Sequence, residues 1–370
     1  MKYSLVFPCK DEEKAIKICI TKAKSAFKKE NISDYEIIVV DNNSSDKSVK
    51  IAKTLGVKII SEKTQGYGAA LKRGFEESKG EYVLMCDADN TYDLRELQKF
   101  LKFKNKDVVI GNRFNKKMEK GAMTFMHKFV GNPLFSSISK LFFRIPCSDT
   151  HCGFRMIKKD SLKKLDLQSS GMEIASEMLI KAQKNNMSIK EVDITYSKRI
   201  GDSKLRSFND GWRHLKMILL YSPKHLFFIP GLLLFLVGFI LMIFLQLDLL
   251  NISGNVLNAI LLLIGSISII LGFQLVLLWI YAKTYTIIQL KEKDVIVEYI
   301  HNNISLEKTI GAGFFLIGIS ILALIVALPN NSVNFQGSLL NLGIIVLTII
   351  VLGIQTIASG FMLSILGNKR

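Results

Sequence analysis

The sequence predicts an α/β domain with a doubly wound, mostly parallel sheet, followed by a membrane region of four helices. Three observations lead to this prediction. Short apolar runs alternate with amphipathic helical patterns over residues 1–225, which is typical of βαβ units. Four long, charge-free apolar stretches follow, each long enough to cross a hydrocarbon core about 30 Å thick. Residues 1–225 also hold 43 of the 49 basic and 27 of the 32 acidic residues, and so nearly all of the net charge of +17.

The elements of the first part can be assigned in order. Five stretches are expected to be strands: Tyr3–Phe7, Glu36–Asp41, Lys58–Ser61, Tyr82–Cys86 and Asp107–Ile110. Four are expected to be helices: Asp11–Lys29, Asp46–Leu55, Tyr67–Ser78 and Leu94–Lys102. Ligands of such sheets bind at the carboxyl ends of the strands. This rule directs attention to Pro8–Glu12, Asp41 and Asp87–Asp89, which follow the first, second and fourth expected strands.

The expected domain boundaries follow from the same patterns. A soluble domain covers residues 1–206. Within it, the Phe- and Met-rich stretch 122–145 contains scattered cations and is expected to form interfacial amphipathic helices, with buried core helices as the alternative. A juxtamembrane amphipathic segment is expected at 207–226. The membrane region 227–370 has four expected spans, at 227–247, 256–282, 310–328 and 339–366.

The loop charges predict how the spans are oriented. The connections 248–255 and 329–338 contain no Lys or Arg, whereas the connection 283–309 and the C-terminal Lys369-Arg370 do. By the positive-inside rule, the large N-terminal domain and both termini are expected in the cytoplasm. Four spans require both ends on the same side, so the assignment is self-consistent.

A basic domain tethered to a bilayer is expected to attract anionic lipid headgroups or phosphate-bearing substrates. Nucleic acid is the less favoured partner, because the sequence contains no nucleic-acid-binding motif. The five cysteines form no Cys-x-x-Cys pair, which indicates neither a disulfide framework nor a zinc site. The sequence leaves the oligomeric state open.

Asp87-Ala88-Asp89 is the most informative short motif. It directly follows an apolar strand, and two carboxylates one residue apart at a strand end can hold a hard divalent cation that bridges diphosphate oxygens. A solvated turn is the alternative reading of such a motif. Asp41 also follows a strand and is expected to accept hydrogen bonds from a base or ribose, or else to cap the next helix.

Motifs in a fixed order resemble a known family. FPCKDEE, VVDNNSSD, QGYGAALKRGF, DADN and IGNRF resemble family 2 glycosyltransferases of the GT-A (Rossmann-like) fold. The later SDTHCGFRMIKKD, GMEIASEMLIKA and YSKRIGDSKLRSFNDGWRH are similar to the polyprenyl-phosphate sugar synthase branch, the dolichol-phosphate mannose or glucose synthases. The resemblance covers about residues 3–225, and the membrane helices match members of this branch that carry an integral anchor.

The resemblance implies roles for the matching residues. Those implied to bind the donor nucleotide sugar are Pro8, Glu12, Asp41, Asp87, Ala88, Asp89, Arg113, Arg199 and Lys204. Asp87 and Asp89 are implied to hold Mg²⁺ or Mn²⁺. Those implied to contact an acceptor phosphate are Arg113, Ser203 and Lys204, and the catalytic set is Asp89, Arg113, Glu177 and Arg199. The sequence departs from the family at Asp11, Asn42 and Thr91, where Asn, Asp and Gln are usual.

The implied reaction is a transfer of a hexose or N-acetylhexosamine from a nucleotide-diphosphate sugar to polyprenyl or dolichyl phosphate. A lipid phosphate is already an anion, so no strong general base is required. The demand is instead for a metal and for cations that hold two phosphates close together. A uridine donor is favoured over GDP-mannose, because GMEIASEM and DGWRHL look nearer to glucose-type members.

Other functions are alternatives to this reading. One is a membrane glycosyltransferase that acts on another lipid or on a polysaccharide, although the Gln-x-x-Arg-Trp motif of processive synthases does not occur. Another is a non-catalytic carrier of lipid-linked sugar or a scaffold. The near absence of ionisable residues within the spans disfavours transport.

Overall fold

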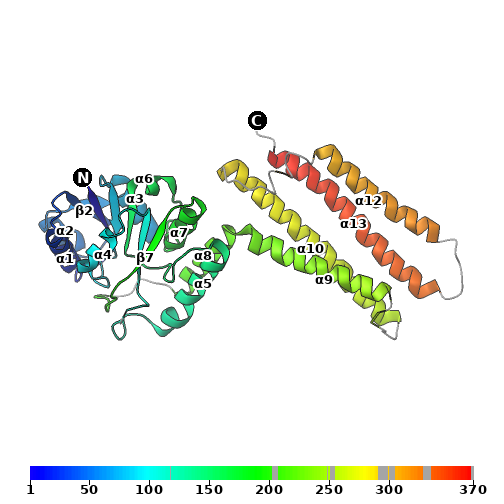
Figure 1. The fold of residues 1–370 in the computed structure, drawn as a ribbon, viewed down its shortest axis with the longest axis horizontal. Coiled ribbons are helices and arrows are strands. Elements are labelled where there is room, and N and C mark those ends of the chain that lie inside the picture. Colours follow the sequence, from blue (N-terminus) through cyan, green and yellow to red (C-terminus); the bar gives the residue numbers. More distant parts are fainter. Residues whose placement is uncertain are drawn as a thin grey trace. The chain divides into compact units, whose positions relative to one another are not determined.

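The computed structural model describes residues 1–116, 118–201, 207–247, 249–250, 255–290, 299, 305–327 and 335–367. The chain folds into two compact units, Met1–Tyr221 and Ser222–Arg370 (Figure 1).

The first unit is built on a seven-stranded sheet. Its strands are β1 (Tyr3–Cys9), β2 (Tyr35–Asp41), β3 (Lys58–Ser61), β4 (Tyr82–Met85), β5 (Val108–Asn112), β6 (Arg155–Lys158) and β7 (Ile189–Asp193). They lie in the order β3-β2-β1-β4-β6-β5-β7. Only β6 runs antiparallel to its neighbours β4 and β5. The predicted fold class, a mostly parallel α/β sheet followed by apolar helices, is therefore confirmed.

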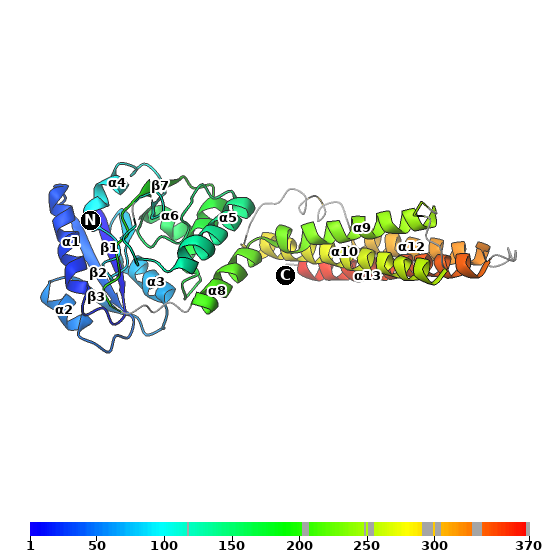
Figure 2. The ribbon, with the colours of Figure 1, turned by 90° about the horizontal axis from the view of Figure 1, so that it is seen from below.

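Helices cover both faces of this sheet. They are α1 (Ile16–Lys29), α2 (Ser48–Thr54), α3 (Tyr67–Glu77), α4 (Leu97–Leu101), α5 (Asn132–Phe143), α6 (Lys159–Lys164), α7 (Ile174–Lys184) and α8 (Ser207–Leu220). Figure 2 shows α1 and α2 on one face and α3 on the other. Side chains alternate between the faces of a strand, so Tyr3 packs near Phe27 of α1, whereas Val6 lies under Gly74 of α3, where a Cβ would come within 2.3 Å of it.

The five expected strands are all present, but β6 and β7 were not expected. Both are short and carry charged residues, and β7 reads IKEVD, so neither shows the apolar run that marked the other strands. Three of the four expected helices, α1, α2 and α4, begin later than expected, whereas α3 begins at Tyr67 as expected. Asp11 has a positive φ of 50° and α1 starts only at Ile16. The stretch expected as Leu94–Lys102 opens with a 3₁₀ turn, Leu94–Glu96, capped by Asp93.

The stretch 122–145 contains a π-helical turn, His127–Gly131, which continues into α5. Large apolar side chains of this stretch and of α8 are exposed: Phe125, Met126, Phe129, Leu134, Leu141, Trp212 and Leu220. Lys128, Lys140 and Arg144 lie on the same stretch. An exposed apolar surface of this kind marks an interaction site in a soluble unit.

A buried polar cluster joins α5, α7 and α8. His151 Nε2 lies 3.3 Å from His214 Nδ1, and Ser176 Oγ of α7 lies 2.9 Å from the same His214 atom. Thr150 connects His151 to Ser136 of α5. Burial, and then the nearby Arg155, lowers the pKa of His214 to about 4, so the cluster is built for neutral imidazoles.

The second unit contains α9 (Ile229–Gln246), α10 (Asn255–Leu290), α12 (Leu306–Ala327) and α13 (Phe335–Gly367), preceded by a π-helical turn, Lys224–Phe228. Four segments are long and apolar enough to cross a membrane: Lys224–Gln246, Val256–Ile287, Leu306–Val326 and Leu340–Leu366. They fall on the four expected spans, and the chain is an integral membrane protein.

Glycines and hydroxyls hold these helices together. A Cβ on Gly238 of α9 would lie 2.5 Å from the Gly265 carbonyl of α10, so this pair lets the two backbones approach closely. Between α10 and α13, Ser266 and Thr348 hydroxyls lie 2.7 Å apart. Gln355 Nε2 donates to Gln274 Oε1 at 3.0 Å in the same interface. Such pairs satisfy polar groups that lipid cannot solvate.

The histidine cluster makes the stability of the protein depend on pH. The folded-state pKa of His214 lies below the ordinary value of 6.5, so the unfolded chain binds the proton more readily. Its contribution is therefore complete above pH 6.5 and is lost as the pH falls toward 4. We expect the contribution of His214 to the free energy of unfolding to fall by about 2 kcal/mol between pH 7 and pH 5.

Thermal unfolding of the full-length protein at several pH values measures this effect. His214→Gln, which retains a hydrogen-bonding group but cannot titrate, should lack this contribution, so its change in unfolding free energy between pH 7 and pH 5 should differ from that of wild type by about 2 kcal/mol. His127→Gln is the matched control and should retain the wild-type slope. Equal slopes for wild type and His214→Gln would contradict the prediction.

Candidate active site

The carboxyl ends of β1, β2 and β4 lie side by side. Cys9 pairs with Asp41 across β1 and β2, and Val6 pairs with Met85 across β1 and β4. The segments that follow these strands therefore meet at one edge of the sheet, as the sequence predicted. Pro8 lies at the end of β1, paired with Val40 of β2, and Ala88 follows β4 and is buried.

Asp87 is held between an aromatic hydroxyl and a glycine. Tyr67 Oη donates a hydrogen bond to Asp87 Oδ1 at 2.7 Å. A Cβ on Gly153 would lie 2.7 Å from Asp87 Oδ2, so only glycine leaves room for this carboxylate. Burial, and then the neighbouring Asp89 charge, raises the pKa of Asp87 to about 6. Two carboxylates so placed favour a cation between them.

Asp89 is buried and has partners on both oxygens. Thr91 donates to Oδ1 through its backbone N–H at 3.0 Å and through its hydroxyl at 2.6 Å. Arg199 Nη1 lies 3.2 Å from Oδ2. The other end of the same guanidinium contacts Glu12 Oε1. The structure thus brings together Glu12, Asp89 and Arg199, which are far apart in the sequence.

Arg113 is fixed by a residue to which the sequence reading gave no role. Its Nε and Nη2 donate to the two oxygens of Asp149 at 2.6 and 2.7 Å, and its guanidinium carbon lies 5.1 Å from the centre of the Tyr196 ring. Burial would lower the pKa of Arg113, but the fully buried Asp149 outweighs this effect and keeps the pKa well above its ordinary value. This bidentate pair fixes the plane of the guanidinium.

A second buried arginine holds the loop that carries Asp149. Arg155 is fully buried and donates to the carbonyl oxygens of Thr150, Cys152 and Ala175 at 2.8–2.9 Å. These bonds tie the segment 150–152 to α7. The motif SDTHCGFRM contains Asp149, Thr150, Cys152 and Arg155, but the sequence alone does not show which of its side chains face one another.

The loop after β2 is stabilised by two of the three residues that depart from the family pattern, Asn42 and Asp11. Asn42 donates to the carbonyls of Glu62 and Thr64 and accepts from Gly66 N–H. Asp11 accepts from the N–H and hydroxyl of Ser45. Asp41 accepts from Ser44 N–H at 3.1 Å, which is the local turn contact considered as an alternative, and it is paired with Cys9 across β2 and β1.

Glu177 lies in a different environment from the other candidates. It is fully buried, and its oxygens accept from the backbone N–H groups of Gln168 and Ser169, both at 2.8 Å. Lys181 lies 2.8 Å from the same carboxylate. These contacts anchor the segment 168–169 to α7, so any contribution to catalysis remains a prediction. Ser203 and Lys204 fall outside the described residues.

The residues at this edge suit a magnesium or manganese ion that is shared with a ligand. Within the described ranges, no group of three or more His, Cys, Asp or Glu side chains could hold a metal ion. The donor set here is two carboxylates, Asp87 and Asp89. Mg²⁺ commonly binds through one or two carboxylates together with substrate phosphates and water, so the site fits an ion that arrives with a diphosphate.

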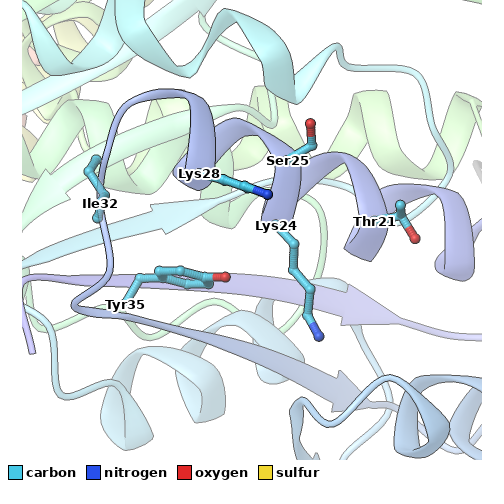
Figure 3. A pocket seen from close by; sticks show the side chains of 6 residues that line it. All are labelled: Thr21, Lys24, Ser25, Lys28, Ile32 and Tyr35. Atoms are coloured by element: carbon cyan, nitrogen blue, oxygen red, sulfur yellow. The ribbon is translucent and has the colours of Figure 1, made fainter.

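A shallow groove elsewhere on the unit has no part in this site. It lies between α1 and the amino end of β2 (Figure 3), and not at the carboxyl ends of the strands. Its lining residues are Thr21, Lys24, Ser25, Lys28, Ile32 and Tyr35. Lys24 Nζ donates to the Leu55 carbonyl, so one of its two cations is already engaged.

Buried carboxylates at the carboxyl ends of parallel strands, with arginines beside them, are typical of enzymes that bind a nucleotide diphosphate. Comparison with known proteins identifies the family. Residues 4–166 match the model of glycosyl transferase family 2. Residues 280–367 match the family 2 C-terminal transmembrane region. The chain belongs to the family 2 glycosyltransferases and is an enzyme of this class.

Two relatives come from Haloferax volcanii. The low-salt glycan biosynthesis hexosyltransferase Agl6 is 33% identical over 99% of this chain and 89% of its own length. A dolichyl-phosphate hexose transferase is 31% identical over 48% of this chain and 76% of its own. Among solved structures, glucosyl-3-phosphoglycerate synthase from Mycobacterium tuberculosis, crystallised with Mn²⁺, UDP and phosphoglyceric acid, is 18% identical with a TM-score of 0.49, covering 60% of this chain and 78% of that one.

The Arg113–Asp149 pair predicts that Asp149 is needed for turnover although it lies behind the arginine. Asp149→Asn removes the counter-charge of a buried guanidinium. We expect it to lower kcat by about 10²-fold, and to cost about 3 kcal/mol of stability.

Initial rates of sugar transfer and thermal unfolding of the same preparations measure the two effects. Asp34→Asn is the matched control, because the Asp34 side chain is exposed and pairs with the N-terminal amine, and it should change neither quantity. An Asp149→Asn protein with wild-type kcat would show that the position of Arg113 does not depend on this pair.

Proposed function

We propose that this enzyme transfers a hexose or N-acetylhexosamine from a nucleotide-diphosphate sugar to a polyprenyl or dolichyl phosphate at the cytoplasmic face of a membrane. The observation that carries the proposal is the group Asp87, Asp89, Arg113 and Arg199 at one edge of the sheet. It combines carboxylates for a metal with two arginines for phosphate oxygens. A uridine nucleotide is the proposed donor, in preference to GDP-mannose.

The proposed roles follow from the contacts. Asp87 and Asp89 hold the metal, which when bound neutralises charge on the departing diphosphate. Pro8, Glu12 and Asp41 line the nucleoside side, where β1 and β2 end. Arg113 lies behind the carboxylates with its Nε and Nη2 already bound to Asp149. Its remaining nitrogen is therefore the one proposed to bind a phosphate oxygen.

A phosphate acceptor agrees with what surrounds the site. A hydroxyl acceptor would need a side chain that takes its proton, whereas a lipid phosphate is already ionised. Glu177, a carboxylate that the family resemblance implied to be catalytic, is bound to backbone N–H groups and to Lys181. One relative is named as a dolichyl-phosphate hexose transferase, which supports the same acceptor class.

The proposed acceptor enters along the surface formed by 122–145 and α8. Exposed aromatic side chains there, such as Phe125, Phe129 and Trp212, suit the boundary between headgroups and acyl chains. The interspersed cations suit anionic headgroups. The proposed domain arrangement is a catalytic domain over 1–206, a juxtamembrane segment over 207–226 and the membrane region over 227–370, with Lys204 and Ser203 near the phosphates.

A donor and acceptor panel tests the reaction. With Mg²⁺ or Mn²⁺, purified full-length protein should form lipid-linked product from polyprenyl phosphate and a UDP-sugar, and none from the corresponding polyprenol. Asp89→Ala should lower the rate by about 10³-fold or more, since it removes the principal metal ligand. Glu76→Ala, on the exposed surface of α3, is the control.

The panel also separates the alternatives. Product formed from polyprenol would show that the acceptor is another lipid. Product formed from an oligosaccharide would show that the acceptor is a polysaccharide. Full turnover by Asp89→Ala would contradict the metal-dependent enzyme as drawn. A rate with GDP-mannose above that with every UDP-sugar would overturn the donor preference alone.

The proposed orientation is tested by labelling introduced cysteines. The five native cysteines are all buried in the first unit, so background labelling should be low. Ser253→Cys, in a connection without Lys or Arg, should react with an impermeant maleimide on intact cells. Ser305→Cys should react only after the membrane is opened. The reverse pattern would place the catalytic unit outside the cytoplasm.

A further inference from the structure

Arg199 occupies a special place among the cations of the site. Its Nη1 lies 3.2 Å from Asp89 Oδ2, and its Nη2 lies 2.5 Å from Glu12 Oε1. Both carboxylates are nearly buried, at 7% side-chain exposure each, while the arginine side chain is 24% exposed. One guanidinium therefore bridges the proposed metal ligand and a carboxylate on the nucleoside side.

The backbone on either side of Arg199 is fixed. Ser197 N–H donates to the Thr91 carbonyl at 2.9 Å, and Ile200 N–H donates to the Asp89 carbonyl at 3.1 Å. The guanidinium can consequently leave Asp89 by rotation of the side chain alone. Gly201, which follows Ile200, has a positive φ of 101°.

The Arg199–Asp89 contact fills the hydrogen-bonding capacity of the carboxylate but not that of the guanidinium. Arg199 Nε is buried and has no hydrogen-bond partner among the residues that the structure describes, and a buried unsatisfied donor costs about 1–3 kcal/mol. Asp89 Oδ2, in contrast, is covered by the cation. The arginine thus has an unused donor that an anionic oxygen could accept, and it blocks the oxygen that a metal ion would need.

We propose that Arg199 is an exchangeable counter-ion of Asp89, which the metal and the donor diphosphate replace together. Without a nucleotide, Arg199 neutralises Asp89 and weakens the binding of a divalent cation alone. When a nucleotide diphosphate is present, Arg199 turns from Asp89 to the phosphate oxygens and frees the carboxylate. The inference rests on the proposed metal-dependent function. It adds that the protein binds a divalent cation weakly until the nucleotide diphosphate is bound.

This exchange predicts opposite effects of one substitution under two conditions. In nucleotide-free full-length protein, Arg199→Gln should bind Mn²⁺ about tenfold more tightly than wild type, because a close charge competitor is removed. With saturating UDP, the same variant should bind Mn²⁺ more weakly than wild type, because the diphosphate has lost a cation. The free Mn²⁺ signal in electron paramagnetic resonance measures both affinities without any turnover.

Two further variants make the result specific. Arg73→Gln removes one positive charge from an exposed pair on α3 and should match wild type in both conditions, which controls for net charge. Asp89→Asn in the Arg199→Gln background should abolish the gain. Thermal unfolding of each preparation verifies that the variants are folded, and Arg199→Lys, which keeps the charge, should restore the weak nucleotide-free binding.

Failure of this inference differs from failure of the proposed function. If Arg199→Gln binds Mn²⁺ no more tightly than wild type without nucleotide, while Asp89-dependent binding with UDP persists, the exchange is overturned and the metal-dependent transferase stands. If no variant binds Mn²⁺ through Asp89, with UDP or with GDP, both are overturned.

Discussion

Two carboxylates, Asp87 and Asp89, leave a strand whose residues are all buried, and their charge constrains the rest of the site. Burial and mutual repulsion raise the pKa of Asp87 to about 6. Neighbouring groups stabilise these carboxylates. Tyr67 donates a hydrogen bond to Asp87, Thr91 donates one to Asp89, and Arg199 forms an ion pair with Asp89. A site so dependent on positive charge suits a reaction in which a metal and phosphates enter together.

Arg113 at this edge of the sheet is itself positioned by buried polar contacts. Asp149 fixes Arg113 through both carboxylate oxygens, and Arg155 fixes the segment next to Asp149 through three backbone carbonyls. Both arginines are buried, so each needs its partners to offset desolvation. The motif SDTHCGFRM therefore supports Arg113, which explains why it contains a buried acid, Asp149, and a buried arginine, Arg155.

The membrane unit is built from contacts that lipid permits. Glycine pairs such as Gly238 and Gly265 bring backbones together, and the Ser266–Thr348 and Gln274–Gln355 pairs satisfy polar groups within the apolar helices. Its architecture suits an anchor that keeps the enzyme where a lipid-bound acceptor is found.

The sequence by itself determined the alternation of strands and helices, the four spans and the location of Asp87 and Asp89, because periodicity and strand-end position are local properties. Family membership also followed from motif order. Only the tertiary structure decided that β6 and β7 complete the sheet, since their sequences lack an apolar run and their pairing is non-local. It also decided that Asp149 holds Arg113, that Glu177 anchors a loop, and that Arg199 bridges Asp89 and Glu12. Those contacts join residues 36 to 187 positions apart, or depend on which backbone groups a buried carboxylate meets, and no pattern along the chain encodes them.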